Sequence, residues 1–251
     1  MKYAIITGSS KGLGESIAKL FLESGVHVVG LSRSNNDYLS VIAKENNAIF
    51  KHIPCDLEKI ESLEQVCEEV ADIVFSEETN TIYLVNNAGV VEPVKQSMHI
   101  QANELKSHVH INTIAPMVLT NYFLDKATEK EIPLICAIVT SGAAESPMYG
   151  WSAYCTTKAS MNMYTKTVAL EQEELKTDHK IIAFSPGIMD TEMQKKIRSS
   201  TKSEFLQLET FQGYKENNLL KSTELVGGVL IDILVDTDIN SGKIYNVKDY
   251  L

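Results

Sequence analysis

Short runs of apolar and β-branched residues alternate with longer amphipathic segments along almost the whole chain. The strand-like runs lie at residues 3–7, 27–32, 48–54, 82–87, 136–141, 180–186 and 243–247. The helix-like segments lie near residues 13–24, 35–46, 59–76, 102–127, 152–175 and 222–235. Apolar strands that alternate with helices are typical of a parallel sheet covered by helices on both faces. The sequence therefore predicts a doubly wound α/β fold with about seven strands.

A single domain is expected, because no stretch rich in Pro, Gly or Ser divides residues 1–251. One segment, approximately residues 189–221, interrupts the alternation and contains EMQKKIRSS and SEFLQLETFQGYKE. An insertion of this length in a compact domain is usually functional, so we interpret it as a small helical lid over a substrate site. A pair of surface helices without a role is the alternative.

Charge and composition exclude several classes of function. The net charge is −10 and no block of Lys or Arg occurs, which argues against nucleic acid or an anionic membrane as a partner. Apolar runs are too short to span a bilayer, and the N-terminus MKYAIITG lacks the features of a signal peptide, so a cytoplasmic protein is expected. No metal site is expected, since His108 and His110 are two residues apart and would face different sides of a helix.

A glycine-rich loop, TGSSKGLG at residues 7–14, follows the first strand-like run and opens the first helix. Gly8, Gly12 and Gly14 allow a tight turn and the close approach of a pyrophosphate to a helix N-terminus. A glycine cluster alone is weak, but this one lies in the βαβ context that such a site requires. The loop therefore predicts a dinucleotide site in a Rossmann-type fold.

The end of the second strand-like run indicates which dinucleotide is bound. The sequence there is LSRSNN, with Arg33 and no acidic residue until Asp37. A basic residue at this position suits the 2′-phosphate of NADP, whereas an acidic residue suits the 2′-hydroxyl of NAD. Lys11 offers a second cation, so NADP(H) is favoured. Alternatively, both side chains are solvated surface charges.

A Tyr-x-x-x-Lys spacing occurs twice, at Tyr154–Lys158 and at Tyr122–Lys126. Only the first pair is preceded, thirteen residues upstream, by a serine at the end of a strand-like run, Ser141. Residues at i and i+4 share a helix face, so Lys158 is predicted to lie beside Tyr154, lower the pKa of its phenol and reach the cofactor ribose. Ser141 is predicted to orient a substrate carbonyl for protonation. Tyr122 is predicted to be a packing residue.

Six motifs, in order, resemble the signature of the short-chain dehydrogenase/reductase family. They are TGSSKGLG (7–14), NNAG (86–89), Asn112, Ser141, YCTTK (154–158) and PGIMDT (186–191). The resemblance implies a Ser–Tyr–Lys–Asn tetrad, in which Asn112 holds a water in a proton relay to Lys158. On its own, Asn112 would be interpreted as a polar helix residue with local partners.

The chain ends SGKIYNVKDYL and lacks the D-G-G motif common near the end of this family. This ending, with YGWSAYCTTK at residues 149–158 and MQKKIRSS at residues 193–200, more closely resembles the bacterial benzil reductase and sepiapterin reductase branch. The resemblance also implies a homodimer or homotetramer packed through the long helices near residues 102–127 and 152–175.

The family resemblance implies a set of cofactor-binding residues, with Asp56 at the adenine and residues 186–191 at the nicotinamide. The full set is Gly8, Ser10, Lys11, Gly12, Leu13, Gly14, Arg33, Asp56, Leu57, Asn87, Ala88, Gly89, Tyr154, Lys158, Pro186, Gly187, Ile188 and Thr191.

The expected substrate pocket is mostly apolar and aromatic, which suits a carbonyl flanked by bulky or aromatic groups. Its candidates are Ala143, Met148, Tyr149, Trp151, Ile188, Met189 and Met193, with Phe205, Phe211 and Tyr214 from the lid. Any of them can equally be ordinary core, but Trp151 leads into Tyr154 and is the strongest candidate.

These observations predict an NADPH-dependent carbonyl reductase whose substrate is a 1,2-dicarbonyl, such as benzil or a sepiapterin-like diketone. A 3-oxoacyl thioester reductase is one alternative, although an acidic chain is poorly suited to docking an acidic carrier protein. A non-catalytic regulator that senses NADPH is the other, although the tetrad is complete.

Overall fold

Seven parallel strands form one sheet in a computed structural model of the protein, which describes residues 1–236 and 238–251. The strand order is β3-β2-β1-β4-β5-β6-β7. This is the order of a doubly wound sheet, which is the fold class that the sequence predicts. Their bounds are β1 (Lys2–Thr7), β2 (His27–Ser32), β3 (Phe50–Pro54), β4 (Thr81–Asn86), β5 (Leu134–Val139), β6 (Lys180–Ser185) and β7 (Ile244–Asn246). The chain changes direction between β1 and β4, and ligands of such sheets bind at this switch point, beyond the carboxyl ends of the strands.

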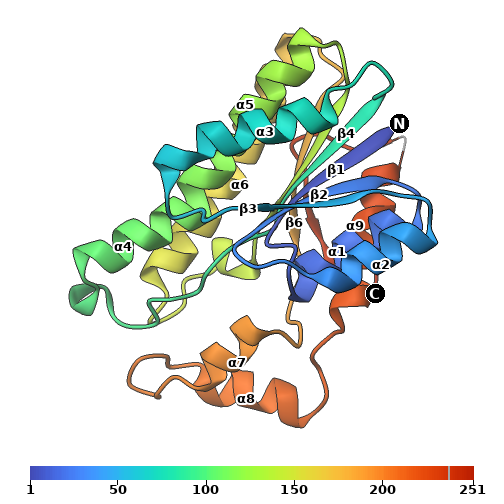
Figure 1. The fold of residues 1–251 in the computed structure, drawn as a ribbon. Helices are drawn as coiled ribbons and strands as arrows, with labels where there is room; N and C mark the ends of the chain where they lie inside the picture. Colours follow the sequence, from blue (N-terminus) through green and yellow to red (C-terminus); the bar gives the residue numbers. More distant parts are fainter. Residues whose placement is uncertain (237) are drawn as a thin grey trace.

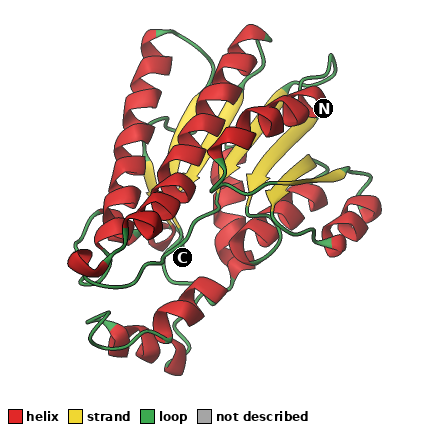
Figure 2. Ribbon diagram, turned by 60° about the vertical axis from the view of Figure 1, so that its left-hand side comes forward, coloured by secondary structure: helices red, strands yellow, loops and turns green. Residues whose placement is uncertain are grey.

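Helices cover both faces of the sheet (Figures 1 and 2). The helices are α1 (Gly12–Glu23), α2 (Asp37–Glu45), α3 (Leu63–Val74), α4 (Ala102–Val109), α5 (Ala115–Glu129), α6 (Ser152–Glu174), α7 (Glu192–Arg198), α8 (Leu208–Glu216) and α9 (Thr223–Val235). A π-helical turn, η3 (His110–Ile114), joins α4 to α5. None of the helices in the described residues combines the length and apolar character needed to cross a membrane.

The alternation of side chains along each strand produces two separate apolar cores. In β1, Ala4 and Ile6 pack in the core that includes α1 and α9, whereas Tyr3 and Ile5 pack in the core that includes α3 and α5. Because both faces are covered, both sets of side chains are apolar, which explains the continuous hydrophobic strands in the sequence.

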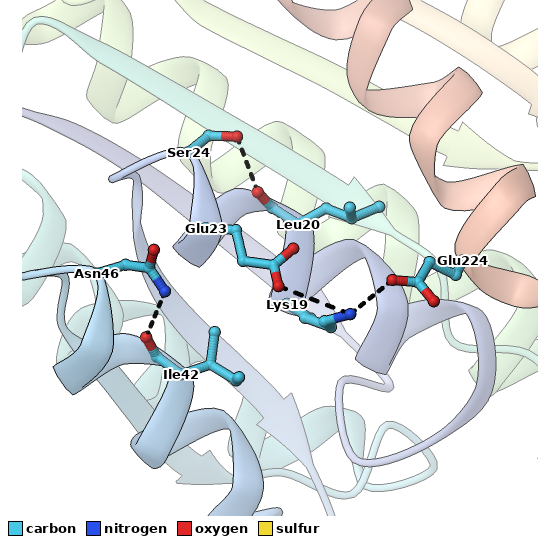
Figure 3. A network of polar contacts seen from close by, with 7 residues as sticks. All are labelled: Lys19, Leu20, Glu23, Ser24, Ile42, Asn46 and Glu224. Carbon is cyan, nitrogen blue, oxygen red and sulfur yellow. Dashed lines mark hydrogen bonds and ion pairs between the residues drawn. The ribbon is translucent and has the colours of Figure 1, made fainter.

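Helix α1, which begins in the glycine loop, is held against α9 by polar contacts near its middle (Figure 3). Lys19 Nζ lies 2.5 Å from a carboxylate oxygen of Glu224 and 3.6 Å from one of Glu23. The Ser16 hydroxyl donates to Thr223 Oγ1 at 2.7 Å. Exposed ion pairs contribute only about 0–1 kcal/mol each, so apolar packing provides most of this contact.

The segment between β6 and α9 forms a two-helix extension beyond the carboxyl ends of the strands. Figure 1 shows α7 and α8 lying apart from the two helical layers. A parallel bridge between Met189 and Lys221 closes its base, with the Asp190 N–H donating to the Lys221 carbonyl at 3.1 Å. The two ends of the extension therefore fall at the residues that bound the expected lid.

Candidate active site

The glycine loop turns sharply between β1 and α1. Gly8 and Gly12 adopt positive φ values of +70° and +63°, which glycine tolerates best. A β-carbon on Gly14 would lie 2.2 Å from the Gly8 carbonyl oxygen, so only glycine fits there. The Asn87 side chain donates to the Thr7 carbonyl at 2.9 Å and ties the loop to the end of β4. The result is the backbone cradle that a pyrophosphate requires.

Two cations lie beside this cradle. Asn36 Nδ2 donates to the Ser10 carbonyl at 3.2 Å and to the Glu15 carboxylate at 2.9 Å, which holds the turn after β2 against the glycine loop. Lys11 and Arg33, one from each of these segments, are exposed, and neither takes part in an ion pair among the described residues. Both are therefore available to a phosphate.

Apart from Tyr154 and Lys158 in α6, the remaining predicted cofactor residues follow the ends of β3, β4 and β6, so they lie at the same edge of the sheet. Asp56 follows β3 and lines a surface cavity of about 500 Å³. The β-carbon position of Gly12 lies 3.9 Å from Thr191 Cγ2, which brings the segment after β6 to the glycine loop. Leu13 and Leu57 are exceptions, because their side chains pack in the two apolar cores and leave only their backbone available.

Tyr154, Lys158 and Ser141 come together where β5 ends and α6 begins. Ser141 lies two residues past β5 and caps a short 3₁₀ turn, with its hydroxyl accepting from the Ala143 N–H at 3.2 Å. Burial raises the pKa of Tyr154 to about 12, and the hydrogen bond with Ser141 opposes this shift. Burial therefore outweighs the expected lowering of the phenol pKa, and the phenol is protonated at neutral pH.

Lys158 is buried below Tyr154. Its Nζ lies 5.8 Å from the centre of the Tyr154 ring and donates to the Val139 carbonyl at 2.8 Å. Burial lowers the pKa of Lys158 to about 8. The ammonium is therefore charged at neutral pH and loses its proton within the range of ordinary buffers.

Asn112 lies in the π-helical turn η3, where an extra residue in the turn is often associated with function. Its amide pairs with both backbone groups of Val90, at 2.7 Å and 2.8 Å. Its Nδ2 also lies 3.0 Å from Nε2 of His108, for which the sequence predicted neither a metal site nor a place beside the tetrad. The i, i+4 spacing of His108 and Asn112 could have predicted this contact, because residues at that spacing share a helix face. No group of metal-ligating side chains occurs in the part of the chain that the structure describes.

A cluster of apolar side chains joins Tyr154 to the α7–α8 extension. It contains the predicted residues Ala143, Met148, Trp151, Met193, Phe205, Phe211 and Tyr214, together with Val91, Val94, Cys155, Ile197 and Leu208. The Trp151 ring stacks on Phe205 at 4.6 Å and meets Tyr154 edge-on at 5.2 Å. The buried Trp151 Nε1 has no hydrogen-bond partner in the described structure.

Other predicted pocket residues lie elsewhere. Tyr149 is exposed, and its hydroxyl accepts from Gln96 at 2.7 Å. Met189 packs against the core that includes α1 and α9, and Ile188 belongs to none of the apolar clusters. In the second Tyr-x-x-x-Lys pair, Tyr122 packs against the other core and Lys126 pairs with Glu129, so neither reaches the tetrad.

The fold and these side chains define an oxidoreductase: the chain belongs to the short-chain dehydrogenase family, whose pattern matches residues 2–202. Over full length it is 37% identical to the benzil reductase ((S)-benzoin forming) of Bacillus cereus, covering 99% of this chain and 100% of that protein. Its identity to the benzil reductase of Bacillus subtilis strain 168 is 38%, covering 100% of both.

Bovine sepiapterin reductase is 25% identical over 248 residues, covering 95% of this chain and 91% of that protein. Benzil reductases and a sepiapterin reductase, the two kinds of enzyme that the sequence resembles, are therefore both among the similar proteins. Among solved structures, the short-chain dehydrogenase/reductase YIR035C of Saccharomyces cerevisiae superposes with a TM-score of 0.82 at 27% identity. The superposition covers 98% of this chain and 96% of that one.

Proposed function

We propose that the protein is an NADPH-dependent reductase of 1,2-dicarbonyl compounds such as benzil. The observation that carries the proposal is the meeting of Ser141, Tyr154 and Lys158 under an aromatic cluster, in a chain that is 37–38% identical to benzil reductases. When bound, NADPH supplies the hydride that reaches the carbonyl carbon. The glycine loop would hold its pyrophosphate, and Lys11 and Arg33 its 2′-phosphate.

The side chains of the tetrad orient the substrate and transfer the proton. Ser141 donates to the substrate carbonyl oxygen and holds it near the phenol, and Tyr154 gives its proton to that oxygen. A phenol with a pKa of about 12 remains protonated at neutral pH, and it is still far more acidic than the alcohol formed. The charged Lys158 stabilises the phenolate that remains, and Asn112 supports the return of the proton.

The Trp151 indole favours a substrate with two carbonyls. Its N–H is buried without a partner, and its ring lies 5.2 Å from the Tyr154 ring. An unpaired buried donor is costly, whereas a ligand acceptor satisfies it. We propose that this N–H, which protein atoms enclose in the free enzyme, becomes accessible when the substrate enters and then donates to its second carbonyl while the first meets Ser141 and Tyr154. Phe205, which stacks on Trp151, and Phe211, which meets Phe205 edge-on, make this side of the site apolar and aromatic, as an aromatic substituent requires.

A substrate panel tests this assignment. Purified protein is mixed with NADPH and, separately, with benzil, with a phenyl ketone that has one carbonyl, and with a 3-oxoacyl thioester, and NADPH absorbance is followed. We expect the largest kcat/KM for benzil. Preference for the thioester would assign the chain to fatty-acid chemistry instead. Tight NADPH binding without oxidation on any compound would identify a regulator.

A further inference from the structure

A buried histidine, His108, lies between the Asn112 amide and the main chain of Glu92. Both side chains, of His108 and Asn112, are only 1% exposed. The ring Nδ1 lies 2.6 Å from the Glu92 carbonyl oxygen, and Nε2 lies 3.0 Å from Asn112 Nδ2. The ring also meets Tyr154 edge-on, with centroids 6.3 Å apart. His108 therefore contacts two members of the tetrad directly.

The partners of His108 determine its tautomer. A carbonyl oxygen only accepts, so Nδ1 carries the proton and donates to Glu92. Burial lowers the pKa of His108 below its ordinary value, so the ring is neutral and Nε2 is an acceptor. Asn112 Nδ2 therefore donates to Nε2.

The same contacts fix the orientation of the Asn112 amide. The Val90 N–H donates to Oδ1 at 2.8 Å, and Nδ2 donates to the Val90 carbonyl at 2.7 Å and to His108 at 3.0 Å. A flipped amide would face two acceptors with its oxygen and a donor with its nitrogen. Oδ1 thus remains on the side of Lys158: Oδ1 lies 3.2 Å, and Lys158 Nζ 3.5 Å, from the β-carbon position of Gly89.

We propose that His108 is a positioning residue for the reduction. It holds the Asn112 side chain against Val90, and so fixes the π-helical turn that carries Asn112 near Lys158. The Thr157 hydroxyl, 3.0 Å from Nε2 and three residues beyond Tyr154, connects the same ring to α6. The inference rests on the proposed reductase function.

Three substitutions separate positioning from packing. His108→Gln can place an amide oxygen where Nε2 lies and so can still accept from Asn112. His108→Asn is shorter and reaches only the position of Nδ1, so it retains a donor for Glu92 and loses the bond to Asn112. His108→Leu removes both bonds. We expect kcat for benzil to fall roughly tenfold to a hundredfold in the Asn and Leu variants and by no more than about threefold in the Gln variant.

The dissociation constant of NADPH, measured by fluorescence, and the KM for benzil are expected to change little in folded variants. Melting curves identify any variant that fails to fold. If His108→Leu fails to fold, the comparison of His108→Gln with His108→Asn still tests the inference. Equal losses of kcat in His108→Gln and His108→Asn would overturn the inference. So would losses of kcat that follow the melting temperature alone. An active wild type with unchanged kcat in the Asn and Leu variants would do the same. An inactive wild type would overturn the proposed function itself.

Discussion

Burial controls the ionisation of the two side chains that handle the proton. It raises the pKa of Tyr154 to about 12 and lowers the pKa of Lys158 to about 8. Burial disfavours the charged form of each group, so the same physical cause raises the pKa of the phenol and lowers the pKa of the ammonium. In the range of pH 6 to 9, Tyr154 is therefore a proton donor throughout, and Lys158 is the group of this pair that changes charge.

The pH dependence of reduction follows from Lys158. Below about pH 8 the ammonium is charged and stabilises the phenolate, and above it the charge is lost. We expect kcat for benzil reduction to be level near neutrality and to fall about tenfold per pH unit well above pH 8. Steady-state rates at saturating NADPH measure this. Lys158→Arg, which keeps its charge, should lack the fall, and a wild-type rate level to pH 10 would contradict the assignment.

Lys11 and Arg33 are the residues that we propose select NADPH over NADH. Both are exposed, without an ion pair in the described structure, and carried by segments that contact one another. We expect Arg33→Ala and Lys11→Ala each to raise the KM for NADPH roughly tenfold and to leave the KM for NADH unchanged, since only NADPH has the 2′-phosphate. Lys130→Ala, at an exposed position after α5, is the control. Parallel changes for both cofactors would show that these cations do not bind the 2′-phosphate.

At the scale of elements, the α7–α8 extension, which we propose is a lid, contacts the loop that precedes α6. Gly150 has a φ of +87°, and a β-carbon there would lie 2.0 Å from the Glu204 carbonyl oxygen. Gln96 Nε2 donates to the Ser203 carbonyl in the same region. The stack of Trp151 on Phe205 then joins the start of α6 to the lid. The position of α8 is thus linked to the same turn that orients Tyr154.

A methyl group at Gly150 should displace the lid. In Gly150→Ala we expect the KM for benzil to rise roughly tenfold while NADPH affinity is retained, because the atoms nearest the added carbon belong to Glu204 and Phe205 and not to the glycine loop. The emission of Trp151, the only tryptophan, should shift as Phe205 moves. Gly228→Ala, in α9 with no atom within 4 Å of the added carbon, is the matched control and should stabilise the fold by about 0.5–1 kcal/mol. Unchanged benzil kinetics in Gly150→Ala would contradict a role for the lid.

The positions of most elements could be predicted from the sequence, since hydrophobic period and glycine placement are local properties. The expected strand 136–141 is β5 at Leu134–Val139, so Ser141 lies in the following turn instead of in the strand. The π-helical turn at Asn112 could not be predicted, because one extra residue in a turn leaves no periodic signal. The contact of Trp151 with Phe205 depends on long-range packing between segments far apart in the chain.

At the scale of the whole molecule, α6 presents apolar side chains to solvent. Met163 is 64% exposed and Leu170 is 57% exposed, and their spacing of seven places them on one helix face. The family resemblance implies an oligomer packed through this helix and through the segment that forms α4 and α5. We propose that this face is buried between copies of the chain.

Light scattering during gel filtration tests the oligomer. We expect the wild type to elute as a dimer or tetramer and the double variant Met163→Lys, Leu170→Lys to elute as a smaller species, because two buried charges would oppose association. Leu219→Lys, at a position of similar exposure outside α6, is the control. A monomeric wild type would contradict this proposal.

The most direct test of the central claim compares Tyr154→Phe with Tyr122→Phe. Each substitution removes one hydroxyl from a tyrosine that stands four residues before a lysine, but only Tyr154 lies with Ser141 and Lys158. The kcat for benzil and the dissociation constant of NADPH are measured for both variants. Tyr154→Phe should bind NADPH normally and lose at least about a hundredfold in kcat, which is the low end of what a general acid contributes. Tyr122→Phe should retain wild-type kcat. Near-normal turnover in a folded, NADPH-binding Tyr154→Phe protein would contradict the account.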